Sequence, residues 1–207
     1  PTVHLTCHMG GRPTWNDEIL SFVPEIGATP NMAVVGSANG HMDTGKCFES
    51  AQKEINSLLK TFGKLAKTRK IPKVGPTKFE ISPKWAVEGK GRAWLDYQND
   101  VTVKDVRQSV QENFKSVEHM KRYTTQGMAI DQGKNSNVAA LAILADATGR
   151  GIPETGTTTF RPPFVPVSIA SMGKNAQGSG FAPQRFTTSH AASVDRGSPM
   201  IEAGLWY

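Results

Sequence analysis

The chain has 207 residues, a hydrophobic content of 38%, a formal net charge of +6, 20 glycines and 13 prolines. No apolar run approaches the roughly 20 residues of a membrane span, and the first residues lack the pattern of a signal peptide, so we expect no membrane partner. Two cysteines, Cys7 and Cys47, are too few for a disulfide framework and indicate a reducing, cytoplasmic compartment.

The first third of the chain predicts one half of a nucleotide-binding α/β unit. Residues Thr2–Thr6 predict a strand, and the apolar run Met32–Val35 predicts a buried strand. Small residues follow at 36–40. A helix comes next, because apolar side chains recur at three- and four-residue spacing. These are Phe48, Ala51, Ile55, Leu58, Leu59, Phe62 and Leu65.

The turn before that helix has three interpretations, and the residues alone leave them open. Unpaired N–H groups and a partial positive charge at a helix N-terminus suit a phosphate, as in a dinucleotide-binding turn, although no G-x-G-x-x-G fingerprint is present. Residues Gly40–Cys47 nearly match the P-loop motif G-x-x-x-x-G-K-[ST], but Cys47 lacks the hydroxyl that holds magnesium. The third interpretation is a purely structural strand-to-helix turn.

Histidine and cysteine residues near the N-terminus form a weak metal-binding pattern. The spacing of His4, Cys7 and His8 lets at most two of them bind one ion, and further ligands would have to come from Cys47 or His41. We therefore predict no metal site.

The middle of the chain combines an irregular linker with a helical module. Prolines and glycines interrupt residues 67–93, and residues 60–84 hold eight Lys or Arg against one acid. We interpret this basic stretch as a solvated surface without a nucleic-acid partner, because few aromatic residues interleave with it. Thr102 and Asp105 predict a capping box, and Ser116 predicts the cap of a second helix. The apolar face of the first helix is Val103, Val106, Val110 and Phe114.

The module ends in a buried helix and an extended segment. Ser136 or Asn137 caps an apolar stretch that is predicted to be a buried helix ending at Gly149. The proline-rich segment Gly156–Val167, here called the strap, is predicted to be extended. We expect the strap to lie against another domain or subunit, with Arg161 making a charge-assisted contact there.

Several segments of the chain resemble the alpha subunits of heterotetrameric sarcosine oxidases. The similar residues are Tyr97–Thr102, Ser116–His119, Lys121–Thr125, Gly127 and Met128, Asp131–Lys134 and Gly156–Pro163. The turn Val35–Thr44 is similar to a late strand-to-helix turn of that family's dinucleotide-binding domain, and Gly197–Trp206 is similar to the opening of its folate-binding domain. The resemblance implies that these 207 residues are an internal part of a longer subunit.

The fold class implied by this resemblance is α/β plus α, with five parts in chain order. They are the end of an NAD-binding Rossmann-like domain at 1–66, a linker at 67–93, a small helical module at 94–155, an extended segment at 156–176, and the start of an aminomethyltransferase-like, folate-binding domain at 177–207. The module also resembles small BFD-like iron–sulfur domains, whose four cysteine positions fall on Asp96, Gln98, Asp131 and Ser136. Because thiolates hold cluster iron, the resemblance implies a cluster-less, structural module.

The family oxidises sarcosine (N-methylglycine) to glycine at a flavin in the beta subunit, produces hydrogen peroxide and passes the one-carbon unit to tetrahydrofolate. The resemblance therefore implies an oxidoreductase subunit that binds NAD, with FAD and FMN in the assembled complex and with beta, gamma and delta subunits as partners. The implied NAD-binding residues are Ser37, Met42 and Thr44. No catalytic residue is implied in this segment.

A non-catalytic scaffold subunit of a related amine or imino-acid dehydrogenase complex is the alternative function. The turn at Ser37–Thr44 discriminates between the two functions. An NAD molecule in contact with the turn would favour the enzyme subunit. A side chain of the chain's own at the helix N-terminus would favour the scaffold, because it would take the place of a phosphate.

Overall fold

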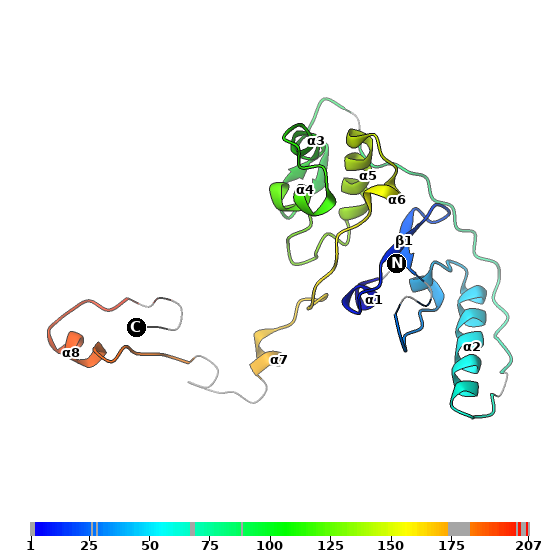
Figure 1. Cartoon of the computed structure of the whole chain (residues 1–207), viewed down its shortest axis with the longest axis horizontal. Helices are drawn as coiled ribbons and strands as arrows, with labels where there is room; N and C mark the ends of the chain where they lie inside the picture. Colours follow the sequence, from blue (N-terminus) through cyan, green and yellow to red (C-terminus); the bar gives the residue numbers. More distant parts are fainter. Residues whose placement is uncertain are drawn as a thin grey trace. The chain divides into compact units, whose positions relative to one another are not determined.

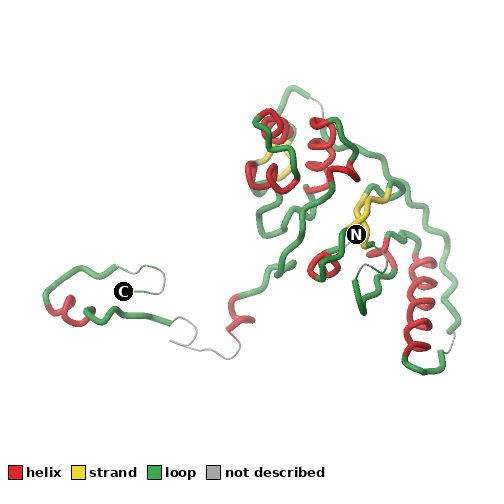
Figure 2. Tube along the Cα trace, viewed as in Figure 1, coloured by secondary structure: helices red, strands yellow, loops and turns green. Residues whose placement is uncertain are grey.

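The structure is a computed structural model that describes residues 3–25, 27, 29–66, 69–87, 89–173, 183–201, 203 and 206. The chain forms two compact units, residues 1–165 and residues 166–207. Figures 1 and 2 show the elements of each unit along the chain. Within the described residues, no helix is both long and apolar enough to cross a membrane.

The N-terminal segment is a short helix followed by a hairpin. Helix α1 (His4–His8) occupies most of the predicted strand Thr2–Thr6, so that prediction is wrong. The cause is local: the Thr6 hydroxyl and the Cys7 N–H both donate to the Val3 carbonyl, which closes a helical turn. Strands β1 (Pro13–Asn16) and β2 (Ser21–Pro24) then pair in antiparallel fashion.

The predicted buried strand Met32–Val35 is also wrong. These residues form no strand, and Met32, Val34 and Val35 are only half-buried. Both sheets of the described chain are two-stranded and antiparallel, so this apolar run has no parallel neighbour with which to pair. A strand needs such a partner for its N–H and C=O groups.

Helix α2 (Thr44–Thr61) follows a short 3-10 turn, η1 (Gly36–Asn39), and confirms the predicted helix. Residues 69–87 are extended and return alongside α2 (Figure 1), where the Gln52 side chain donates to the Arg69 carbonyl. The apolar face of α2 remains largely uncovered, since Phe48 and Leu58 are 44% and 48% exposed. None of the residues of α2 is buried.

The helical module follows the order that the sequence predicted. Its elements are β3 (Trp94–Asp96), β4 (Val101–Thr102), α3 (Val103–Gln111), α4 (Val117–Thr124), α5 (Asn137–Thr148) and α6 (Ile152–Thr155). The capping box at the start of α3 is confirmed, because Thr102 and Asp105 bond reciprocally. The Ser116 hydroxyl accepts from the His119 N–H and so caps α4, as expected.

Helix α5 is the centre of the core. Leu141 and Leu144 are fully buried, and burial of each side chain contributes about 1.5–3 kcal/mol. The helix ends at Gly149 in a left-handed conformation, as predicted. Ser136 occupies the N-cap position, as one of the two predicted alternatives, but its side chain forms no cap bond, and Asn137 is the first residue of the helix. The core also includes Phe22 from the hairpin, so the N-terminal segment packs on the module.

The strap is extended, as predicted, and it leads into the second unit. That unit contains helices α7 (Ile169–Gly173) and α8 (His190–Asp195), so the extended conformation ends before residue 176. The expected start of a folate-binding domain at 177–207 falls partly outside the described residues.

Candidate functional site

The turn between Val35 and α2 is fixed against the first half of that helix. The Gly36 N–H donates to the Ser50 hydroxyl at 3.1 Å, and the Cys47 thiol donates to the His41 carbonyl at 3.1 Å. Gly40 adopts φ +88, and a Cβ at this position would lie 3.2 Å from a methyl group of Val23. Glycine is therefore favoured here for both conformation and space.

The N-terminus of α2 already holds an anion of the chain's own. One carboxylate oxygen of Asp43 accepts from the Lys46 N–H at 2.9 Å, and the other accepts from the Thr77 N–H at 3.0 Å. These N–H groups, Thr77 first, lower the pKa of Asp43. A phosphate at this helix end would be repelled by the Asp43 carboxylate. Because a side chain of the chain's own at this position is what the scaffold function predicts, the observation favours that alternative.

The three predicted NAD-binding residues do not converge on one cavity. Ser37 lies on η1 and is exposed, Met42 is half-buried, and Thr44 is exposed at the first position of α2. All three residues belong to the segment from η1 to the start of α2. None of them lines the cavity that lies beside it.

That cavity has a volume of about 410 Å³ and lies between residues 24–35 and α2. Aliphatic side chains and a few polar groups line it, among them Pro24, Met32, Val34, Val35, Thr29, Asn39, His41 and Lys53. The Thr29 side chain is 95% buried, and its hydroxyl has no hydrogen-bond partner in the described part of the chain. Sequence reasoning missed this cavity, because Thr29 lies in a loop without a recognisable motif.

Three of the four positions that correspond to cluster ligands carry oxygen groups that already serve the fold, and the fourth, Gln98, is exposed. Buried Asp96 accepts from the N–H groups of Gln98 and Gly127, at 2.9 and 2.8 Å. Asp131 accepts from the Gly133 N–H, and the Ser136 hydroxyl accepts from Gln126. These groups do not fit an iron–sulfur cluster, which requires thiolate ligands. Asp96 instead ties the 96–99 turn to the glycine turn after α4.

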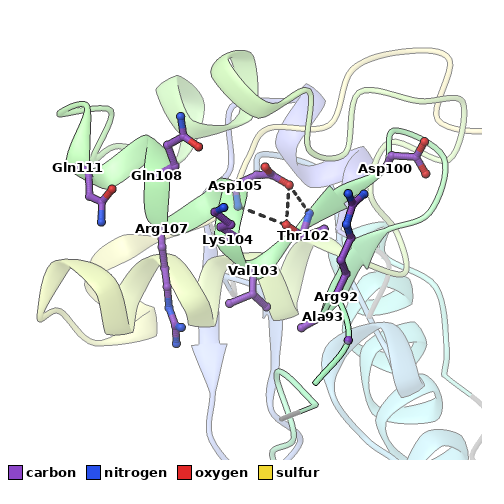
Figure 3. Close-up of a pocket in the computed structure, with 11 residues that line it drawn as sticks. Arg92, Ala93, Asp100, Thr102, Val103, Lys104, Asp105, Arg107, Gln108 and Gln111 are labelled. Carbon is purple, nitrogen blue, oxygen red and sulfur yellow. Dashed lines mark hydrogen bonds between the residues drawn. The ribbon is translucent and has the colours of Figure 1, made fainter. Parts of the chain in front are cut away.

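A second, larger hollow of about 710 Å³ lies beside the capping box of α3 (Figure 3). Asp105 is engaged by Thr102, and Arg92 and Arg107 extend in different directions. The polar groups therefore do not converge on a common point, as they do in ligand sites. We regard this hollow as a feature of the surface.

The strap is held by side chains from two of the segments that carry the sequence resemblance. The Gln132 amide donates to the carbonyls of Arg161 and Pro163, and its oxygen accepts from the Arg161 N–H. Lys134 donates to the Phe164 carbonyl. In addition, Glu118 accepts from the Thr159 N–H. Together these contacts form what we call the strap clamp, which the sequence did not predict.

Helix α1 covers the other side of the strap. The His4 ring stacks on Phe164 with a centroid distance of 3.6 Å, and burial lowers the pKa of His4. Burial also raises the pKa of Cys7, against the opposing effect of the Phe160 N–H. In the described residues, no group of three or more metal-ligating side chains could hold an ion.

Arg161 itself forms no salt bridge among the described residues. Its backbone is held by the strap clamp, while its side chain is exposed. The strap thus lies against the module within the same chain. The expected contact of Arg161 with another subunit stays a prediction.

Comparison with known proteins first defines the class of fold. The structure resembles L-proline dehydrogenase from P. horikoshii with a TM-score of 0.60 and 18% sequence identity, over 81% of this chain and 36% of that one. This likeness shows that the chain has the fold of part of that protein.

Sequence comparison then specifies the family. Residues 90–176 match the Sarcosine oxidase A3 domain. The chain is 37% identical to "Sarcosine oxidase subunit alpha" from Rhizobium meliloti (strain 1021) and 32% identical to that of Corynebacterium sp. (strain P-1), in both cases over its whole length. The chain is therefore a homologue of sarcosine oxidase alpha subunits. It spans 21% and 22% of the length of these two relatives.

Proposed function

We propose that the chain is the connecting segment of the alpha subunit of a heterotetrameric, flavin-dependent sarcosine oxidase in the cytoplasm. In this proposal the assembled complex holds FAD and FMN with beta, gamma and delta subunits. It oxidises sarcosine to glycine with hydrogen peroxide as a product, and it passes the one-carbon unit to tetrahydrofolate. This segment contributes no catalytic residue.

The observation that carries the proposal is the strap clamp. The segments 116–125, 131–134 and 156–163 resemble the family separately in the sequence, and they meet in space through Gln132 and Glu118. Side chains from two of the similar segments thus hold the third, the strap. Their role is to fix the path of the chain between a dinucleotide-binding domain and a folate-binding domain, both of which extend beyond these residues.

We also propose that the module is a cluster-less relative of BFD-like iron–sulfur domains. Asp96 supports this, since its carboxylate receives backbone N–H groups where the related domains have a cysteine ligand. A buried anion at this position holds the turns together without iron. The module then stiffens the subunit and carries no electrons.

NAD binding at Ser37, Met42 and Thr44 is the third part of the proposal. The Asp43 carboxylate at the N-terminus of α2 does not fit the diphosphate of NAD, which must therefore lie away from the helix axis. NAD binding would use the backbone of the turn and the exposed side chains of Ser37 and Thr44.

The test is co-expression of the full-length subunit with its partner subunits. We expect sarcosine-dependent oxygen uptake with stoichiometric hydrogen peroxide, formation of methylenetetrahydrofolate when tetrahydrofolate is present, and one extractable NAD per alpha subunit. A flavin-loaded complex that reduces an artificial acceptor but consumes no oxygen would contradict the oxidase.

The scaffold function stays as a second candidate, because Asp43 caps α2 in the way that a non-binding turn would. It predicts an assembled complex without extractable NAD. In that case a variant with Ser37→Ala and Thr44→Ala would assemble normally and keep full activity. Loss of NAD from this variant alone would exclude the scaffold.

A further inference from the structure

We propose that residues 77–82 form a β-strand by pairing with an extended, acidic segment of another subunit of the complex. These residues belong to the extended segment 69–87, here called the arm, whose positive charge has no role in the proposed function. The inference rests on the proposed function only in that further subunits exist. It adds an interaction surface, the backbone groups that form it and the chemistry of the partner.

The backbone of the arm is open to a partner. Among the described residues only two of its backbone groups form hydrogen bonds: the Arg69 carbonyl accepts from Gln52, and the Thr77 N–H donates to Asp43. Neither two-stranded sheet of the described chain includes the arm. An extended chain with unpaired N–H and C=O groups is a template to which another strand can add.

The side chains of residues 77–82 alternate as they do in a strand. The Lys78 ammonium lies 2.6 Å from the Glu80 carboxylate, which places these two side chains on one face. Phe79 and Ile81 stand at the alternate positions and are 43% and 47% exposed. The segment thus has a charged face and an apolar face, the pattern of a strand that packs on one side.

The edge available for pairing points away from α2. Successive N–H groups of an extended chain point to opposite sides, and the Thr77 N–H points to Asp43 at the start of that helix. The N–H groups of Lys78 and Glu80 therefore point away from α2, and no group of the described chain bonds to them. Prolines on both sides of residues 77–82 end this edge, because proline has no N–H to donate.

Charge identifies the partner segment as acidic. The arm carries five Lys or Arg against a single acid, Glu80, which is already paired with Lys78. The other four cations form no ion pair among the described residues. They are Arg69, Lys70, Lys73 and Lys84. Carboxylates opposite these cations stabilise the pairing, whereas a second copy of the arm would bring like charges together.

Two further observations favour a separate protein subunit as the partner. Concentrated charge of one sign accelerates the encounter of separate molecules, which pairing within one chain does not need. The arm has no tyrosine, and its one tryptophan, Trp85, is half-buried with its ring 6.5 Å from that of Trp15. It therefore lacks the aromatic anchors that are typical of a membrane surface.

The experiment titrates the full-length alpha subunit with the other subunits of its complex and follows binding by biolayer interferometry. Glu80→Pro removes an N–H from the pairing edge, and we expect it to weaken binding about tenfold or more, because a ladder hydrogen bond is lost and the ring crowds the partner strand. Glu80→Ala, the matched control, removes the same carboxylate but keeps the N–H and should bind as tightly as the parent. Both variants should fold normally, since the Glu80 N–H has no partner among the described residues and its ion pair is exposed.

Amide exchange in the parent gives a second measurement that needs no variant. The amides of Lys78 and Glu80 should be unprotected in the alpha subunit alone and protected in the complex. Protection in the alpha subunit alone would assign the partner strand to the same chain and would overturn the proposal. Amides that stay unprotected in the complex would overturn it as well.

A change of charge tests the sign of the partner. The double variant Lys73→Glu and Lys84→Glu should slow association about tenfold at low salt, and the difference should shrink at high salt as ions screen it. Lys104→Glu with Lys115→Glu makes the same change at exposed positions of the module and should have a smaller effect. Equal effects of the two double variants would overturn the assignment of an acidic partner to the arm.

The remaining outcomes separate this inference from the proposed function. Unchanged affinity of Glu80→Pro would overturn the strand pairing while the complex of several subunits stands. A homodimer that Glu80→Pro disrupts would assign the partner strand to a second copy, and binding to phosphatidylserine vesicles in place of the subunits would assign the arm to a membrane surface. Either result overturns the inference. If the parent binds no other subunit, both this inference and the proposed complex are overturned.

Discussion

Helices α2 and α5 differ in how they use their apolar residues. The apolar side chains of α2 recur at the regular spacing that predicted the helix, yet none of its residues is buried. Helix α5 is apolar nearly all round, and seven of its residues are buried in the module. The core around α5 is thus completed by the module together with Phe22 of the hairpin, whereas the described chain leaves the apolar face of α2 largely uncovered. Amphipathic spacing specifies which face is apolar and does not specify what covers it.

The largest effect that would test this contrast is a truncation in α5. Leu144→Ala should destabilise the chain by about 2–5 kcal/mol, because it opens a cavity in a packed core. Leu58→Ala on α2 removes the same atoms from a side chain that is 48% exposed, and should change stability by less than about 0.5 kcal/mol. Urea denaturation followed by circular dichroism measures both. Equal losses of unfolding free energy in the two variants would show that the apolar face of α2 is buried in solution.

A backbone substitution in the module comes next. Gly133→Ala forces a positive φ of 73° on alanine and drives its Cβ into the Asn137 side chain, so we expect a loss of about 3 kcal/mol. Gly149→Ala has a similar φ of 67° but open space around it, and should cost about 1 kcal/mol. Both variants share the cost of a positive φ, whereas only Gly133→Ala adds a clash with Asn137. The difference between their thermal unfolding midpoints therefore measures the clash. Similar midpoints would mean that Asn137 moves aside freely.

The strap clamp predicts a smaller, local effect. Gln132→Leu removes the donors to the Arg161 and Pro163 carbonyls and should destabilise the chain by about 1 kcal/mol. Hydrogen exchange at 158–165 should become faster, while the core of α5 keeps its protection. Gln111→Leu, on the exposed surface of α3, is the control and should leave both regions unchanged. Unaltered exchange in the strap after Gln132→Leu would refute the clamp.

The smallest effect concerns pH at the N-terminus of α2. The pKa of Asp43 is lowered in the folded chain by the N–H groups of Thr77 and Lys46, so this contact stabilises the fold above the unfolded pKa of about 3.9 and is lost as pH falls through the folded value. The protection factor of the Thr77 amide, which compares its exchange with the intrinsic rate at the same pH, should therefore fall below about pH 4. Asp43→Asn should abolish this acid transition, and a transition that persists in the variant would assign it to another group.

Much of the module could be predicted from its sequence because its signals are local. A capping box joins Thr102 to Asp105 three residues away, and Gly149 supplies the left-handed conformation that ends α5. Such features depend on a few neighbouring residues. The wrong strand prediction occurs where the secondary structure depends on a pairing partner. Residues Met32–Val35 have the composition of a buried strand, but no strand of the described chain pairs with them. In α1, local bonds from Thr6 and Cys7 prevailed over a weak strand pattern.

The amino-acid sequence by itself determined the family resemblance, the caps of α3 and α4, the buried character of α5 and the extended strap, since each is encoded in residues close together in the chain. Only the tertiary structure decided that Gln132 and Glu118 grip the strap, that Asp43 occupies the end of α2, and that Thr29 lines a cavity with an unsatisfied hydroxyl. All of these except the local cap bond of Asp43 depend on segments between 29 and 41 residues apart or on a cavity formed by several loops. Neither hydrophobic periodicity nor a sequence motif predicts contacts between such distant segments, because these contacts form only when the core brings the segments together.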